Sequence, residues 1–179
     1  MTSAHIKQKT VGAMNLKINN ATRINIVVRI IAGIFFCMYF SFLLYRLFFY
    51  AYGQYFRFFA GEISYNLIPF KTILNYLNNI SLIDFDIWFF NLFGNVCAFM
   101  PMGFLLPVIF PKFQSFKAIA TVTFLASFVL EIVQLWLRLG IADIDDVILN
   151  TFGGILGYFL FISFHKLVGQ IITVKSKSR

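Results

Sequence analysis

Residues 118–137, AIATVTFLASFVLEIVQLWL, decide the fold class of this protein. Glu131 is the only charged residue in this stretch. A helix of about 20 predominantly apolar residues is long enough to cross the hydrocarbon core of a bilayer. The stretch therefore predicts a transmembrane helix that holds one carboxylate at membrane depth.

The rest of the chain has the same character, with three further apolar stretches at about 26–50, 87–110 and 147–164. Of the 179 residues, 60% are hydrophobic and only 12% are charged. A soluble domain has about 25% charged residues and leaves much of its surface in water. The composition therefore excludes a soluble enzyme and a disordered regulator. It predicts an all-α integral membrane bundle of four transmembrane helices.

The positions of the charges predict how this bundle is oriented. Lys and Arg gather before the first span, between the second and third, and after the fourth, whereas acidic residues gather in the other two connections. Because basic loops stay in the cytoplasm, both termini are expected there, in a multi-pass protein of a bacterial cell membrane. The predicted order is a basic segment 1–25, the first helix 26–50, an outer loop 51–86, a three-helix core 87–168 and a basic tail 169–179. The first span is too long for a signal peptide and is expected to remain as an anchor.

The outer loop contains one segment with helical periodicity, residues 71–80, KTILNYLNNI. Ile73, Leu74, Leu77 and Ile80 fall on one side of a helix and the asparagines on the other. The pattern predicts a short interfacial helix on the outer membrane surface. Pro69 just before it is compatible with a helix start.

Polar residues in the third span lie on one helical face. Ser127, Glu131, Gln134 and Arg138 recur at spacings of four, three and four. At about 1.5 Å per residue, Glu131 lies about 10 Å inward from Arg138. An ionisable group at that depth is costly and is a functional candidate by default.

The second and fourth spans are predicted to bring polar residues to the same depth. Asn91 and Asn95 lie one turn apart in the second span, and Asp143, Asp146 and Asn150 are expected to share a face of the fourth. Asp145 points away from that face and is the weakest candidate. The predicted ligand-binding residues are Asn91, Asn95, Glu131, Gln134, Arg138, Asp143, Asp146 and Asn150.

Each of these residues also has a structural interpretation. Asn95 and Asn150 could join helices by hydrogen bonds, each worth about 0.6 kcal/mol in membranes. Arg138 could be an interfacial anchor or pair with Glu131. The aspartates between residues 143 and 146 could cap the fourth helix. Gly153 and Gly157 form a small-xxx-small pair that favours close helix packing.

Four sequence elements resemble the VanZ-like family of bacterial membrane proteins. They are 66–70, NLIPF; 91–95, NLFGN, with Phe99, Pro101, Gly103, Leu106 and Pro107; 131–134, EIVQ; and 143–147, DIDDV, with Asn150, Thr151, Gly153 and Gly154. Any one element is weak alone, but four in register are specific. The resemblance covers about half of the chain. It implies a multi-pass plasma-membrane protein associated with lowered sensitivity to glycopeptides of the teicoplanin type.

Three functions remain open at this point. The favoured one is a binding module, in which an outward-facing polar pocket with an apolar floor takes a lipid-linked cell-wall precursor or a lipoglycopeptide. The second is a lipid-modifying enzyme, with Glu131 as a general base and Asp143, Asp146 and Asn150 around Mg²⁺. The third is a transporter or flippase, for which four spans are few unless a homodimer forms. A scaffold in which the cluster only joins helices is the structural alternative.

The partners expected from the sequence are membrane lipids and one of these amphiphiles. No cofactor or resident metal is predicted. The net charge of +8 does not indicate nucleic-acid binding, because topology and anionic lipid head groups explain why the basic residues flank the spans on one side.

Overall fold

The computed structural model describes the backbone of residues 2–50, 64–139 and 141–177. Within these ranges it describes the side chains of residues 23–48, 64–139 and 141–170. The described chain is almost entirely helical, so the predicted all-α class is confirmed. The first part of the predicted outer loop, residues 51–63, lies outside the described residues.

Four of the described helices are long and apolar enough to cross a membrane, as predicted. They are α1 (Thr2–Tyr45), which continues as a π-helical turn at Arg46–Tyr50, α3 (Phe85–Ile109), α4 (Phe116–Leu137) and α5 (Ile144–Lys177). The candidate spans within them are Arg23–Phe48, Phe85–Ile109, Phe116–Leu137 and Ile144–Gln170. A short 3₁₀-helix at Pro111–Phe113 connects α3 to α4.

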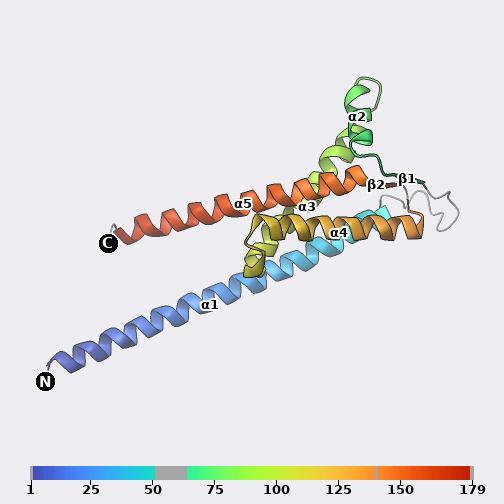
Figure 1. Cartoon of the computed structure of the whole chain (residues 1–179). Coiled ribbons are helices and arrows are strands. Elements are labelled where there is room, and N and C mark those ends of the chain that lie inside the picture. The colour runs from blue at the N-terminus through green and yellow to red at the C-terminus, as the bar shows by residue number, and fades with distance from the viewer. Residues whose placement is uncertain (1, 51–63, 140, 178–179) are drawn as a thin grey trace.

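The four spans alternate in direction, so both termini lie at the same end of the bundle (Figure 1). We call this the terminal end. The opposite end holds α2 (Lys71–Asn78) and the strands β1 (Ser64–Asn66) and β2 (Ile141–Asp143), and we call it the α2 end. The helix predicted within residues 71–80 is confirmed as α2, and its position on the membrane surface stays a prediction. Both α1 and α5 extend beyond their apolar spans, because their basic flanks contain no proline to stop them.

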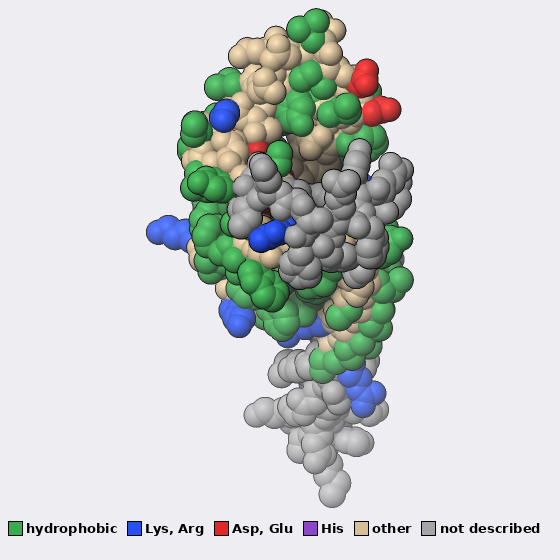
Figure 2. Space-filling view, turned by 90° about the vertical axis from the view of Figure 1, so that its right-hand side faces the viewer, with side chains coloured by type: hydrophobic (Ala, Val, Ile, Leu, Met, Phe, Trp, Pro, Cys, Tyr) green, Lys and Arg blue, Asp and Glu red, His purple; other side chains and the backbone are tan. Residues whose placement is uncertain are grey.

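The core is small and receives residues from all four spans. The buried cluster consists of Leu43, Phe99, Met102, Leu106, Ile119 and Tyr158. Large hydrophobic residues on the outside of the bundle remain exposed, among them Phe42, Phe90, Leu125 and Phe159. Figure 2, which looks onto the α2 end, shows hydrophobic side chains along both flanks of the molecule. Such an apolar surface is compatible with lipid around the bundle and not with water.

Glycines allow α3 and α5 to approach closely. A Cβ atom added at Gly103 would collide with the backbone of Gly154, and one added at Gly157 would collide with the backbone of Met100. Small residues let helix backbones approach in a membrane, where lipid tails leave no hydrophobic driving force for association. The α3–α5 pair therefore forms the centre of the bundle and fixes the depth of the polar residues on both helices.

Two prolines inside α3, Pro101 and Pro107, remove backbone donors from the helix. Side chains from outside α3 donate to carbonyls near them. Tyr39 Oη donates to the carbonyl of Ala98 at 2.6 Å, and Gln114 Nε2 donates to the carbonyl of Pro107 at 3.2 Å. These bonds hold α1 and the α3–α4 connection against the proline-containing helix.

Candidate functional site

Two short strands join the loop before α2 to the start of α5. Strand β1 pairs in parallel with β2, in the register Ser64↔Ile141, Tyr65↔Ala142 and Asn66↔Asp143. The pairing lies at the α2 end (Figure 1). It places the segment 66–70 beside the acidic segment 143–146, although about 75 residues separate them along the chain. The sequence did not predict this pairing.

Asp145 holds the N-terminus of α2. Helix α2 has no side-chain cap of its own, because its N-cap position is Phe70 in a left-handed conformation with φ 65°. The Asp145 carboxylate instead accepts hydrogen bonds from the backbone N–H groups of Phe70 at 2.5 Å, Thr72 at 2.7 Å and Ile73 at 3.1 Å. The side chain is fully buried. A carboxylate suits this position because a helix N-terminus offers unpaired N–H groups and a partial positive charge.

Asp143 is a second structural carboxylate, and both of its oxygens are occupied. Its Oδ1 accepts from Asn66 Nδ2 at 3.0 Å and from the backbone N–H of Asp145 at 2.9 Å. Its Oδ2 accepts from Thr72 Oγ1 at 2.5 Å. The prediction that Asp143 lies on a helical face with Asp146 and Asn150 was wrong. Asp143 belongs to β2, and α5 begins one residue later.

Glu131 differs from these two, because only one of its oxygens is occupied within the described chain. The side chain is 9% exposed, and its Oε2 accepts a hydrogen bond from the backbone N–H of Asp143 at 3.0 Å. No described residue donates to its Oε1. One turn deeper along α4, Ser127 accepts a hydrogen bond from Asn150 Nδ2 at 2.8 Å. This bond joins α4 to α5 one turn deeper than Glu131.

Asp146 faces α3, where its Oδ1 accepts a hydrogen bond from Asn95 Nδ2 at 2.6 Å. Tyr76 of α2 also lies near this carboxylate. Partial burial, together with the negative charges of Asp146 and Asp143, raises the pKa of Tyr76 above its ordinary value of 10.0. Asp146 and Asp143 therefore raise the pKa of a residue on α2, an element to which neither of them belongs.

The structure gathers most of the predicted residues into one set, which we call the polar cluster. It consists of Asn66, Thr72, Asn95, Ser127, Glu131, Asp143, Asp145, Asp146 and Asn150. One carbonyl in it, Asn150 Oδ1, is buried and has no hydrogen-bond partner in the described chain. Helical periodicity did not predict Asn66 and Thr72 as members of the cluster, and it made Asp145 the weakest candidate. A signal was available, since a helix that starts at Pro69-Phe70-Lys71 has no Ser, Thr, Asp or Asn to cap it.

Three predicted residues lie outside this hydrogen-bonded set. Asn91 is exposed, and its Nδ2 donates to the carbonyl of Ile87 on its own helix at 2.6 Å. Gln134 is 8% exposed, and its backbone carbonyl accepts a hydrogen bond from the backbone N–H of Arg138 at the end of α4. Arg138 ends α4 in a left-handed conformation with φ 54°, and its side chain is exposed.

An open groove of about 370 Å³ borders the polar cluster on the α4 side. Glu131 and Asp143 supply its acidic groups, and the other lining residues are hydrophobic or aromatic. They are Tyr65, Leu67, Phe128, Ile132, Leu135, Ala142, Ile144 and Val147. The groove therefore combines an apolar wall with a carboxylate oxygen, Glu131 Oε1, that has no donor in the described chain.

The same carboxylates fit a magnesium site less well than a site that accepts hydrogen bonds from a ligand. Within the described residues, no group of three or more His, Cys, Asp or Glu side chains is arranged to hold a metal ion. Asn66 and Thr72 already donate to Asp143, which the magnesium hypothesis uses as a ligand. The arrangement is suited to accepting hydrogen bonds from a ligand beside an apolar surface.

Comparisons with known proteins agree with the four sequence elements. The family model described as VanZ/LLP1 matches residues 30–165. A curated relative, Protein VanZ of Enterococcus faecium, is 36% identical over 113 residues, which cover 60% of this chain and 58% of that protein. No solved structure matches the chain. The family match overlaps all four spans and includes the whole polar cluster, and the chain is therefore a membrane protein of the VanZ/LLP1 family.

Proposed function

We propose that the groove beside Glu131 binds the apolar tail of an amphiphile of the cell envelope and thereby lowers sensitivity to teicoplanin-type glycopeptides. The observation that supports this most directly is the lining of the groove. A hydrophobic wall along α4 adjoins Glu131, which has one oxygen without a donor in the described chain. Ligand sites commonly combine an apolar surface with a few polar groups that fix orientation.

The charges on the groove favour one class of amphiphile. Glu131 and Asp143 are its acidic residues, and Asp145 and Asp146 lie directly behind them. Carboxylates accept hydrogen bonds and repel anions. A lipoglycopeptide, whose sugars and peptide offer hydroxyl and N–H donors, fits this lining better than the pyrophosphate of a lipid-linked precursor. Lipoglycopeptide is therefore the proposed ligand, and the lipid-linked precursor is the competitor in the test.

The orientation predicted from the charges supports the same proposal. Basic residues mark the terminal end as cytoplasmic, so the α2 end and its groove would face the outside, where a lipoglycopeptide arrives. The amphipathic helix α2 would lie at the membrane surface beside the groove. An acyl tail that enters the outer leaflet would reach the groove sideways from the lipid.

A binding measurement on the purified protein in nanodiscs tests the proposal. We expect saturable binding of teicoplanin, and binding at least tenfold weaker for deacylated teicoplanin, because the tail would lose its contact with the groove. The competitor is a lipid-linked peptidoglycan precursor. Equal binding of acylated and deacylated teicoplanin, or binding of the precursor alone, would overturn the proposed ligand.

A further inference from the structure

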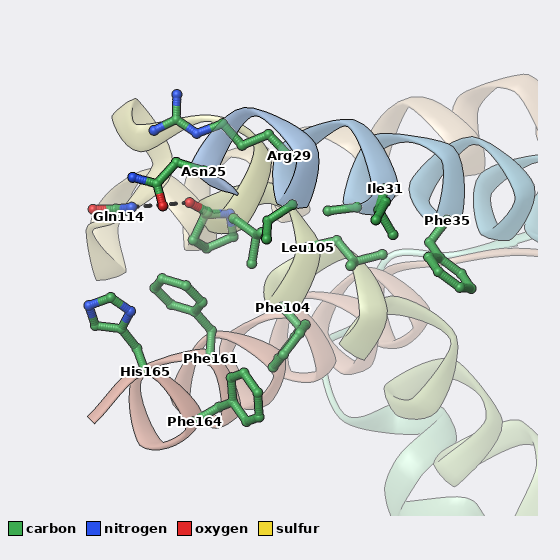
Figure 3. Close-up of a pocket in the computed structure, with 14 residues that line it drawn as sticks. Asn25, Arg29, Ile31, Phe35, Phe104, Leu105, Gln114, Phe161, Phe164 and His165 are labelled. Carbon is green, nitrogen blue, oxygen red and sulfur yellow. Dashed lines mark hydrogen bonds between the residues drawn. The ribbon is translucent and has the colours of Figure 1, made fainter. Parts of the chain in front are cut away.

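A second pocket lies at the terminal end, far from the polar cluster. It has a volume of about 540 Å³ and is formed by α1, α3 and α5 with the connection before α4 (Figure 3). The α2 end, with the groove and the aspartates, is at the other end of the spans (Figure 1). The pocket therefore needs an explanation separate from the proposed function.

The polar lining residues lie together at one end of this pocket. Asn25 of α1, Gln114 of the connection and His165 of α5 lie around the opening, and Arg29 of α1 lines the pocket with its guanidinium directed away from it (Figure 3). Gln114 is held in place, because its Nε2 donates to the carbonyl of Pro107 and its backbone carbonyl accepts from Tyr158 Oη at 3.0 Å. The His165 ring stacks on Phe161 with 5.8 Å between centroids. These groups can donate hydrogen bonds to one ligand head.

The remaining lining is apolar and extends away from this polar opening. Phe104 and Leu105 of α3, Phe161 and Phe164 of α5, and Phe35 of α1 follow one another along the pocket (Figure 3). Phe35 and Phe164 are more than half exposed, so the apolar part is open to the surrounding lipid. A water-soluble metabolite would leave this part of the pocket without a partner. A ligand with an acyl chain would fill it.

The charge at this end of the molecule is positive. The described acidic residues all lie at or near the α2 end: Asp84, Asp86, Glu131, Asp143, Asp145 and Asp146. The basic residues Arg23, Arg29, Lys112, Lys117 and Lys166 belong to the helix ends and the connection at the terminal end. An Arg guanidinium presents a planar set of donors that matches phosphate. Basic pockets between transmembrane helices on the cytoplasmic side are suited to anionic lipid head groups.

We propose that this pocket is a binding site for an anionic phospholipid of the leaflet at the terminal end. His165 and Asn25 donate to the head group, the Arg29 side chain turns from its present direction toward the phosphate, and one acyl chain lies along Phe104, Phe161 and Phe164. The lipid would join α1 to the α3–α5 pair at the terminal end. The site is independent of the ligand proposed for the groove.

Native mass spectrometry of the protein released from nanodiscs tests this proposal. The probes are phosphatidylglycerol and phosphatidylcholine with identical acyl chains, and inorganic phosphate as a competitor. We expect one phosphatidylglycerol to be retained, with phosphatidylcholine at least tenfold weaker. Arg29→Gln should reduce retention of phosphatidylglycerol about tenfold, which corresponds to the loss of one charge-assisted hydrogen bond.

Arg23→Gln is the matched control, because Arg23 lies on the same helix and does not line the pocket. It should retain phosphatidylglycerol as the wild type does. A second variant, Phe164→Gln, should weaken both lipids by changing the apolar wall at an exposed position. The proposal would be overturned if the two lipids were retained equally, or if Arg29→Gln and Arg23→Gln lost phosphatidylglycerol equally. Full displacement of the lipid by inorganic phosphate, or a dimer of the chain without bound lipid, would overturn it as well.

Discussion

The carboxylate of Asp145 accepts a hydrogen bond from the backbone N–H of Thr72 at 2.7 Å, across 73 residues of sequence. Together with the bonds from Phe70 and Ile73, it provides the N-terminal cap that α2 does not have in its own sequence. The surface helix is thus fixed by a residue at the start of the last span. The same span also reaches α3 through Asp146 and α4 through Asn150.

Replacing Asp145 should release α2 from the bundle. Asp145→Ala leaves three backbone N–H groups without their acceptor, and we expect the free energy of unfolding to fall by about 1–3 kcal/mol. Hydrogen exchange of the amides of residues 70–73 should increase more than exchange in α4. Asp84→Asn is the control, because Asp84 occupies the N-cap position of α3 and makes no side-chain cap bond there. Unchanged exchange in α2 would contradict the capping role.

A methyl group between α3 and α5 should destabilise the bundle. A Cβ at Gly157 would collide with the backbone of Met100, so Gly157→Ala should cost about 1–3 kcal/mol by overpacking. Gly94, on the same helix as Met100, has nothing within 4 Å of an added Cβ. Gly94→Ala should therefore be neutral or stabilise by up to about 1 kcal/mol. Thermal unfolding in detergent measures both, and equal unfolding midpoints for the two variants would refute the close packing.

Tyr76 should ionise at higher pH than an ordinary tyrosine. Burial and the charges of Asp146 and Asp143 raise its pKa above 10.0 in the folded protein. A group with a raised folded pKa contributes stability below its unfolded pKa and loses that contribution as pH rises through the folded value. Stability should therefore decline above about pH 10, and Tyr76→Phe should make the decline shallower.

The tyrosinate absorbance of the wild type minus that of Tyr76→Phe reports this titration directly. In an Asp146→Asn background the transition should move to lower pH, because one of the negative charges near Tyr76 is gone. A transition that stays in place would show that Asp146 does not act on Tyr76.

The spans and α2 could be predicted from the sequence because both depend on local periodicity. Apolar stretches longer than the bilayer is thick identify the four helices, and the spacing of Ile73, Leu74 and Leu77 identifies the surface helix. Helical rise predicted Asn95, Glu131 and Asn150 at one depth. In the structure Asn95 bonds to Asp146, and Asn150 bonds to Ser127 one turn deeper than Glu131.

The remaining features depend on contacts between segments distant in sequence. Strands of three residues leave no alternating pattern, so the β1–β2 pairing and the place of Asp143 in it could not be seen. Asp145 was the weakest candidate in the sequence because it points away from the helical face that holds Asp146 and Asn150. In the structure its carboxylate bonds to the N-terminus of α2. The periodicity of the last span cannot predict a partner in another segment of the chain.

The teicoplanin susceptibility of a sensitive bacterium that expresses the protein shows whether the groove beside Glu131 is the working site. Glu131→Gln keeps an amide oxygen that can accept from the N–H of Asp143 but replaces the carboxyl group beside the groove with an amide. Asp86→Asn makes the same kind of change at an exposed residue in the first turn of α3. At equal membrane abundance, the wild type and Asp86→Asn should raise tolerance, and Glu131→Gln should not. If Glu131→Gln protects as well as the wild type, or if the wild type gives no protection, the groove is not the working site.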